Sequence, residues 1–127
     1  MFRWVLRSLA GMAVAAGALG CATAQIREPA GSALFARYCA SCHGRFGEGD
    51  GPVAAVMSIP NLRTLRTRSG GEFPREAVMR YIDGRDPPAA HGERLMPVWG
   101  DTFAAGGDAA ASARIAAITD FVAELQN

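Results

Sequence analysis

The chain has 127 residues, of which 50% are hydrophobic and 20% charged, and its formal net charge is +1 at pH 7. This size and composition suit one small globular domain. The lack of a basic excess excludes binding to nucleic acid or to an anionic membrane surface through charge alone. Every basic residue is Arg, which excludes a partner-docking face built on lysines.

The first residues have the layout of a bacterial signal peptide. Arg3 and Arg7 precede an uncharged run over residues 8–20. A basic start followed by an apolar run of roughly 7–15 residues is typical of such a peptide, and the run is shorter than the about 20 residues that a membrane-spanning helix needs. We expect cleavage after Ala24, which leaves 103 residues with a formal charge of −1. An uncleaved N-terminal anchor is the alternative.

A second processing site overlaps the first. Residues 18–21, which end in Cys21, resemble a lipoprotein site at which Cys21 would be acylated. We favour the soluble form, and expect membrane contact only if Cys21 is lipidated. Either form would be exported to the bacterial periplasm.

A linker over residues 25–30 leads into the domain, which we expect over residues 31–127. Apolar residues Leu34, Phe35 and Tyr38 recur at helical spacing and predict a helix from Gly31 to Cys42. Ser32 or Gly31 is expected to cap it.

That helix ends in Cys39-Ala40-Ser41-Cys42-His43, the C-x-x-C-H pattern of covalent haem attachment. Each thiol can add across a haem vinyl group, and His43 can approach the iron from the same side. Thiol-redox and zinc sites also use C-x-x-C. The chain lacks the additional cysteines and histidines of a closed zinc site, which disfavours that alternative.

The rest of the domain predicts short helices separated by glycine-rich breaks. Residues 44–51 predict a loop bordering the haem, residues 53–57 a short apolar turn, and residues 61–68 and 74–83 two helices. Asp108 is expected as the N-cap of a final amphipathic helix that ends near Leu125. Nothing indicates a strand or a second domain, so the predicted fold class is all-α.

The iron's sixth ligand decides the function, and a Met ligand is typical of electron-transfer cytochromes. Met57 is too near His43 in sequence to reach the opposite face of the haem, and Met79 lies within a predicted helix. Met96 lies in an irregular segment before Pro97, far enough along the chain to cross the haem. We therefore expect His43 and Met96 as the two iron ligands. His91 is the only other histidine and is expected to be an ordinary loop residue, with ligand exchange as the alternative.

These features resemble the bacterial class I (monohaem) cytochrome c family. The resemblance covers residues 31–125. It rests on the C-x-x-C-H motif, the glycine-rich loop ending at Pro52, the Pro60-Asn61-Leu62 and Met96-Pro97-Val98-Trp99-Gly100 segments, and the closing helix.

The resemblance implies three main helices and short helical turns around one haem c, held by thioether bonds from Cys39 and Cys42. It also implies that the first and last helices cross where Gly31 and Phe35 face Phe121. The carbonyl of Pro52 is expected to accept a hydrogen bond from His43 Nδ1–H, which would leave Nε2 for the iron.

Trp99 is expected to pack on the haem and donate its N–H to a propionate, with plain core packing as the alternative. Arg63, Arg66 and Arg68 are expected to form a solvated helix face; contact with an acidic partner or a propionate is the alternative.

The expected function is a periplasmic one-electron carrier. We expect a monomer with no catalytic residues of its own, serving a quinol-oxidising complex, a terminal oxidase or a periplasmic dehydrogenase. One alternative is a dedicated haem subunit of a periplasmic oxidoreductase. The other is a small-gas-binding cytochrome whose Met96 ligand is labile.

Overall fold

The computed structural model describes residues 29–86 and 95–127. All regular structure in these two ranges is helical, which confirms the all-α prediction. The expected signal peptide, Cys21 and His91 lie outside the described residues.

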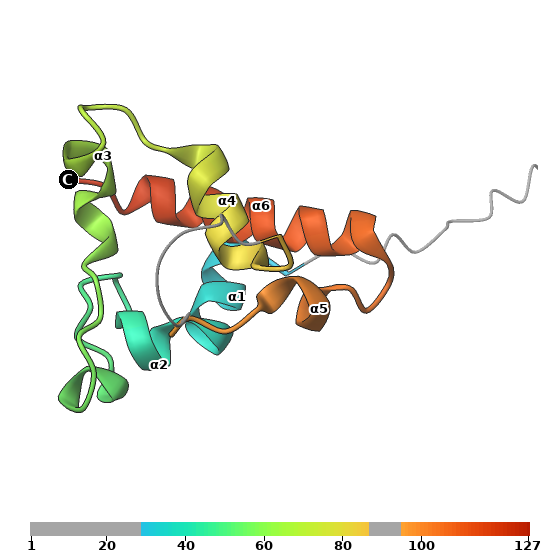
Figure 1. Cartoon of the computed structure of the whole chain (residues 1–127), viewed down its shortest axis with the longest axis horizontal. Coiled ribbons are helices and arrows are strands. Elements are labelled where there is room, and N and C mark those ends of the chain that lie inside the picture. Colours follow the sequence, from blue (N-terminus) through green and yellow to red (C-terminus); the bar gives the residue numbers. More distant parts are fainter. Residues whose placement is uncertain (1–28, 87–94) are drawn as a thin grey trace, which may run out of the picture.

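Three helices of eight or more residues form the frame: α1, Gly31–Tyr38; α4, Arg75–Asp83; and α6, Asp108–Glu124. The shorter helical segments are α2 (Ala40–His43), η1 (Pro52–Ala55), η2 (Leu62–Thr64), α3 (Leu65–Arg68) and α5 (Trp99–Phe103). Figure 1 shows α6 running through the molecule, with α3 and the last residues of the chain at one end.

The other long helices pack on α6, which contacts α1, α4 and α5. Its buried residues recur at helical spacing and are Ala111, Ile115, Ile118, Thr119 and Val122. All of these except Thr119 belong to one apolar core with Leu34 and Phe35 of α1, Ile82 of α4 and Phe103 of α5. The polar side chain among them, Thr119, donates its hydroxyl to the carbonyl of Ile115 over 2.8 Å, so its burial leaves no unpaired donor.

Helices α1 and α6 cross at Gly31. A Cβ on Gly31 would lie 1.9 Å from the carbonyl oxygen of Ala117, so the two backbones meet where there is no side chain. One turn further on, the rings of Phe35 and Phe121 pack with centroids 5.2 Å apart and planes tilted by 57°. The crossing implied by the family resemblance is confirmed.

The helix predicted from Gly31 to Cys42 is present, but it is interrupted at Cys39. Cys39 has φ −114° and ψ −31°, which separates α1 from α2. The cap of α1 is Ala30 rather than Ser32 or Gly31. The helix predicted over residues 74–83 is confirmed: it begins after Pro74 and ends at Gly84, which takes the left-handed conformation with φ 69°.

The sequence predicts Asp108 as the N-cap of α6, but in the structure the N-cap is Gly107. The carboxylate of Asp108 instead accepts a hydrogen bond from Arg85 Nη1 over 2.6 Å. Arg85 also pairs with Asp83, with Nε 2.7 Å from Oδ1 and Nη2 3.0 Å from Oδ2. Hydrogen bonds with the two carboxylates raise the pKa of Arg85, and the cluster ties the end of α4 to the start of α6.

We predict that Gly31→Ala lowers the stability of the haem-loaded protein by about 1–3 kcal/mol, because the added methyl group forces the two helices apart. Denaturant unfolding followed by circular dichroism measures this. Ser32→Ala, at the exposed neighbouring position, is the control and should stay within about 0.5 kcal/mol of the wild type. Equal stability of the two variants would show that the crossing tolerates a side chain.

Candidate haem site

The attachment motif forms a tight turn at the end of α1. The amide of Cys39 donates to Phe35 O over 2.9 Å, and the amides of Cys42 and His43 both donate to Cys39 O, over 3.2 and 2.9 Å. Cys39 is buried and Cys42 half-buried, and neither is in a disulfide. The turn therefore holds two free thiols and an imidazole within five consecutive residues.

The glycine-rich loop packs against the backbone of this turn. The amides of Gly49 and Gly51 donate to His43 O and Cys42 O over 2.9 and 3.2 Å. A Cβ on Gly51 would lie within 2.7 Å of the carbonyl oxygens of Ala40, Ser41 and Cys42. The loop prediction is confirmed, but these glycines are needed for contact with the protein backbone and do not line the cavity described next.

A cavity of about 400 Å³ lies beside the attachment turn, and its lining is mostly apolar. This volume is within the about 300–1,000 Å³ of cofactor sites in proteins. The lining residues are Phe35, Cys39, His43, Pro60, Leu62, Leu65, Arg68, Val78, Tyr81, Ile82, Met96, Ile118 and Val122. One cavity thus brings together Cys39, His43 and Met96, whereas Met57 and Met79 lie outside its lining.

His43 Nδ1 is buried and has no hydrogen-bond partner of proper geometry. Burial lowers the pKa of His43, and the smaller effect of the nearby Pro60 backbone opposes this. The imidazole is therefore neutral at pH 7, the form in which a histidine binds a metal. A neutral ring that carries its proton on Nδ1 has Nε2 available to bind a metal.

The structure sets Pro60, and not Pro52, beside His43. The hydrogen bonds of Gly49 and Gly51 turn the loop back along the attachment turn, so Pro52 is exposed and begins η1. The chain comes back past the loop at Ile59, where a Cβ on Gly49 would approach Ile59 O to 2.7 Å, and Pro60 then lies beside the imidazole. Pro60 belongs to the Pro60-Asn61-Leu62 segment of the family resemblance. The sequence did not predict its position beside His43, because the two residues are far apart along the chain.

Trp99 packs in an aromatic cluster and is not part of the cavity lining. Its ring stacks on Phe103 with centroids 5.9 Å apart and planes at 18°, and Tyr38 meets both rings edge-on at 5.5 and 5.1 Å. These contacts agree with the core-packing alternative. They also account for α5, a helix that the sequence did not predict.

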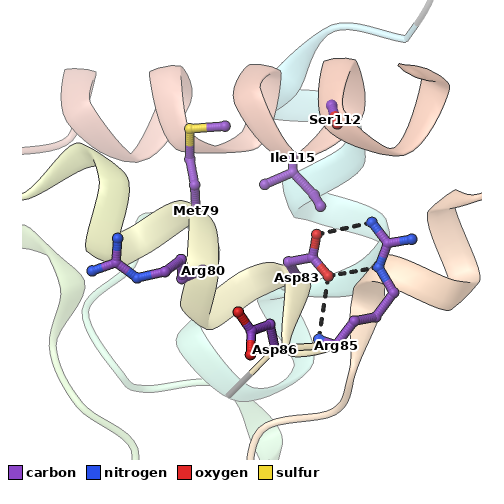
Figure 2. Close-up of a pocket in the computed structure, with 7 residues that line it drawn as sticks. All are labelled: Met79, Arg80, Asp83, Arg85, Asp86, Ser112 and Ile115. Atoms are coloured by element: carbon purple, nitrogen blue, oxygen red, sulfur yellow. Dashed lines mark hydrogen bonds and ion pairs between the residues drawn. The ribbon is translucent and has the colours of Figure 1, made fainter. Parts of the chain in front are cut away.

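Met79 lines a second hollow, of about 440 Å³, most of whose lining residues are charged, whereas the lining of the first cavity is mostly apolar (Figure 2). Figure 2 shows its side chain directed toward α6, while the paired Asp83 and Arg85 form the charged part of the lining. Arg80 and Asp86 add further charge. The two hollows separate the candidate methionines: Met96 shares a cavity with His43, and Met79 does not.

The three arginines of the expected solvated face have different roles. Arg63 is engaged with Asn127 and Glu48, and Arg68 donates from Nη2 to Asn61 O over 3.0 Å while lining the cavity. The side chain of Arg66 is exposed, but its backbone N–H is bound by Gln126. The solvated-face prediction therefore holds for Arg66 and not for Arg63.

The described residues fit a covalently bound haem. The thiol of Cys39, the neutral imidazole of His43 and the thioether of Met96 border one apolar cavity, and Arg68 adds a positive charge at its wall. Cys42 does not line the cavity but lies in the same attachment turn. In residues 29–86 and 95–127 no three His, Cys, Asp or Glu side chains converge on one point. Within the same ranges no helix has the length and apolar character needed to cross a membrane.

Comparison with known proteins agrees with this assignment. The family model described as Cytochrome c matches residues 29–126. No curated protein and no solved structure matches the chain significantly.

We predict that the polypeptide without haem is largely unfolded, because the walls of the cavity would otherwise expose apolar surface to water. In the folded arrangement, burial and the nearby Cys42 raise the pKa of Cys39 from 9.0 to about 12. A rise of this size lowers the thiolate fraction at pH 8 about a thousandfold, and with it the rate of alkylation.

Iodoacetamide should therefore alkylate Cys39 and Cys42 of the haem-free chain at similar rates. A Cys39 that reacts orders of magnitude more slowly than Cys42 would show that the pocket persists without haem. Circular dichroism of the Cys39→Ser, Cys42→Ser double variant gives an independent check, since low helicity is expected there as well.

Proposed function

Because the chain belongs to the cytochrome c family, we propose that this haem-binding electron-transfer protein is a periplasmic one-electron carrier with one haem c and His43 and Met96 as axial ligands. The observation that carries the proposal is the single apolar cavity whose lining includes Cys39, His43 and Met96. Covalent attachment through the thiols of Cys39 and Cys42 is the chemistry that the family implies.

Haem, when bound, supplies an iron that changes between the ferrous and ferric states. The residues of this chain hold it, orient it and keep water away from it. His43 and Met96 provide one nitrogen and one sulfur ligand, and a thioether ligand favours ferrous iron and raises the reduction potential. Leu62, Leu65 and Ile82 supply apolar wall, so little solvent has to reorganise when the charge changes.

In this proposal the carbonyl of Pro60 takes the orienting role that the sequence had suggested for Pro52. Pro60 lines the cavity and its backbone acts on the His43 ring. A hydrogen bond from Nδ1–H to that carbonyl would fix the imidazole plane and leave Nε2 for the iron. Arg68 would lie near the propionates, because it is the cationic side chain in the described lining of the cavity.

The proposed location rests on the signal-peptide pattern of the first residues, and the proposed partners rest on the family. The proposal places the mature chain in the bacterial periplasm, as a monomer or, if Cys21 is acylated, on a membrane surface. Its electron donors and acceptors would be quinol-oxidising complexes, terminal oxidases or periplasmic dehydrogenases. Stable co-purification with one enzyme would identify it as a dedicated subunit instead.

We predict that Met96→Ala, matured in a haem-attaching host, loses the weak long-wavelength sulfur-to-iron band of the ferric protein. Its reduction potential should fall by on the order of 0.1 V or more, within the about 0.8 V that axial ligands span. Absorption spectroscopy and potentiometry measure both effects.

The matched control is Met79→Ala, because Met79 lines the other hollow. It should keep the band and the potential of the wild type. Loss of the band in Met79→Ala but not in Met96→Ala would refute the ligand assignment. Ready binding of carbon monoxide by the wild-type ferrous protein at neutral pH would favour a gas-binding function.

A further inference from the structure

One wall of the haem cavity has little structure of its own. We call residues 60–68 the strap; it contributes Pro60, Leu62, Leu65 and Arg68 to the cavity lining. Its helical segments, η2 and α3, have three and four residues. Helices this short are not stable by themselves, so the position of the strap depends on contacts with other elements.

Gln126, just beyond α6, holds the strap by its side-chain amide. Nε2 donates to Leu62 O over 2.9 Å and to Val122 O over 2.8 Å, and Oε1 accepts from the amide of Arg66 over 2.9 Å. Both N–H donors and the carbonyl acceptor are used, which also fixes the orientation of the amide. Arg66 lies in the first turn of α3, where a helix does not supply acceptors for its own N–H groups.

Two further sets of hydrogen bonds hold the strap close to this amide. Asn127 Oδ1 accepts from Arg63 Nε and Nη2 over 3.1 and 2.7 Å, and its backbone N–H donates to Arg63 O over 3.2 Å. Leu62 also donates its amide to Gly47 O over 2.7 Å. The backbone of Leu62 therefore joins the glycine-rich loop under His43 to the end of α6.

We infer that Gln126 is a positioning residue for the haem site: its amide fixes the strap, and through the strap the wall at Pro60 and Leu62 that faces His43. This inference rests on the proposed function, since it concerns the environment of that iron site. Gln126 itself does not line the cavity.

Loosening the strap has a defined electrostatic effect. A wall that moves away admits water beside His43, and water stabilises the more positively charged ferric form. The reduction potential then falls. A residue with a purely structural role would lower the stability of the fold without moving the potential of the folded protein.

The test uses the haem-loaded full chain and the variant Gln126→Met, which keeps the length of the side chain and removes all three hydrogen bonds. We expect the Arg66 amide to exchange with solvent about tenfold faster or more. We also expect a lower reduction potential at a temperature where every variant is folded. Asn127→Ala, which removes only the acceptor for Arg63, is the milder variant and should lower the potential less.

Ile115→Val is the matched control, because it weakens α6 at a buried residue that does not line the haem cavity. It should lower the stability of the fold, and its potential should equal that of the wild type. An unchanged potential in Gln126→Met would overturn the positioning role, and unchanged exchange at Arg66 would show that Gln126 does not hold the strap. A wild-type protein that takes up no redox-active haem would refute the proposed function, whereas a haem-loaded wild type with an unchanged potential in Gln126→Met would refute the positioning role alone.

Discussion

The close approach of α1 and α6 at Gly31 is the constraint on which the rest of the structure depends. Without a side chain there, the α1 backbone lies against Ala117 O, and Phe35 packs on Phe121 one turn later. That contact sets the direction in which α1 reaches Cys39. The attachment turn therefore takes its place in the molecule from a backbone contact two turns before it.

The haem cavity is built from segments of very different rigidity. Helices α1, α4 and α6 supply apolar side chains from the common core, so that side of the cavity is as fixed as the core itself. The strap forms another part of the lining; Leu62 and Leu65 pack against the core, and hydrogen bonds join its backbone to the glycine-rich loop and to the residues after α6. An electron-transfer site needs this second part to be as firm as the first, because water that enters raises the cost of changing the iron's charge.

The sequence predicted those features whose cause is local. Helical spacing and the flanking Pro74 and Gly84 predicted α4, and the C-x-x-C-H motif with the glycine-rich loop predicted the attachment turn. Helix α5 was missed because its five residues pack against the ring of Tyr38, which is distant in sequence. Pro60 was missed as the neighbour of His43 because local sequence does not tell how far a loop runs before it returns. The contacts of Gln126 with the strap join residues 60 or more positions apart, and no local pattern marks such pairs.

The long-range ties of the strap set an order for folding. Leu62 and Gln126 are separated by 64 positions, so their hydrogen bond forms only after the intervening chain has been closed into a loop, at a cost in entropy. The attachment turn needs only its own neighbours and can form early. We therefore expect the turn that carries Cys39 and Cys42 to form before the strap completes the cavity. The segment that completes the site last is also the one that leaves it accessible longest.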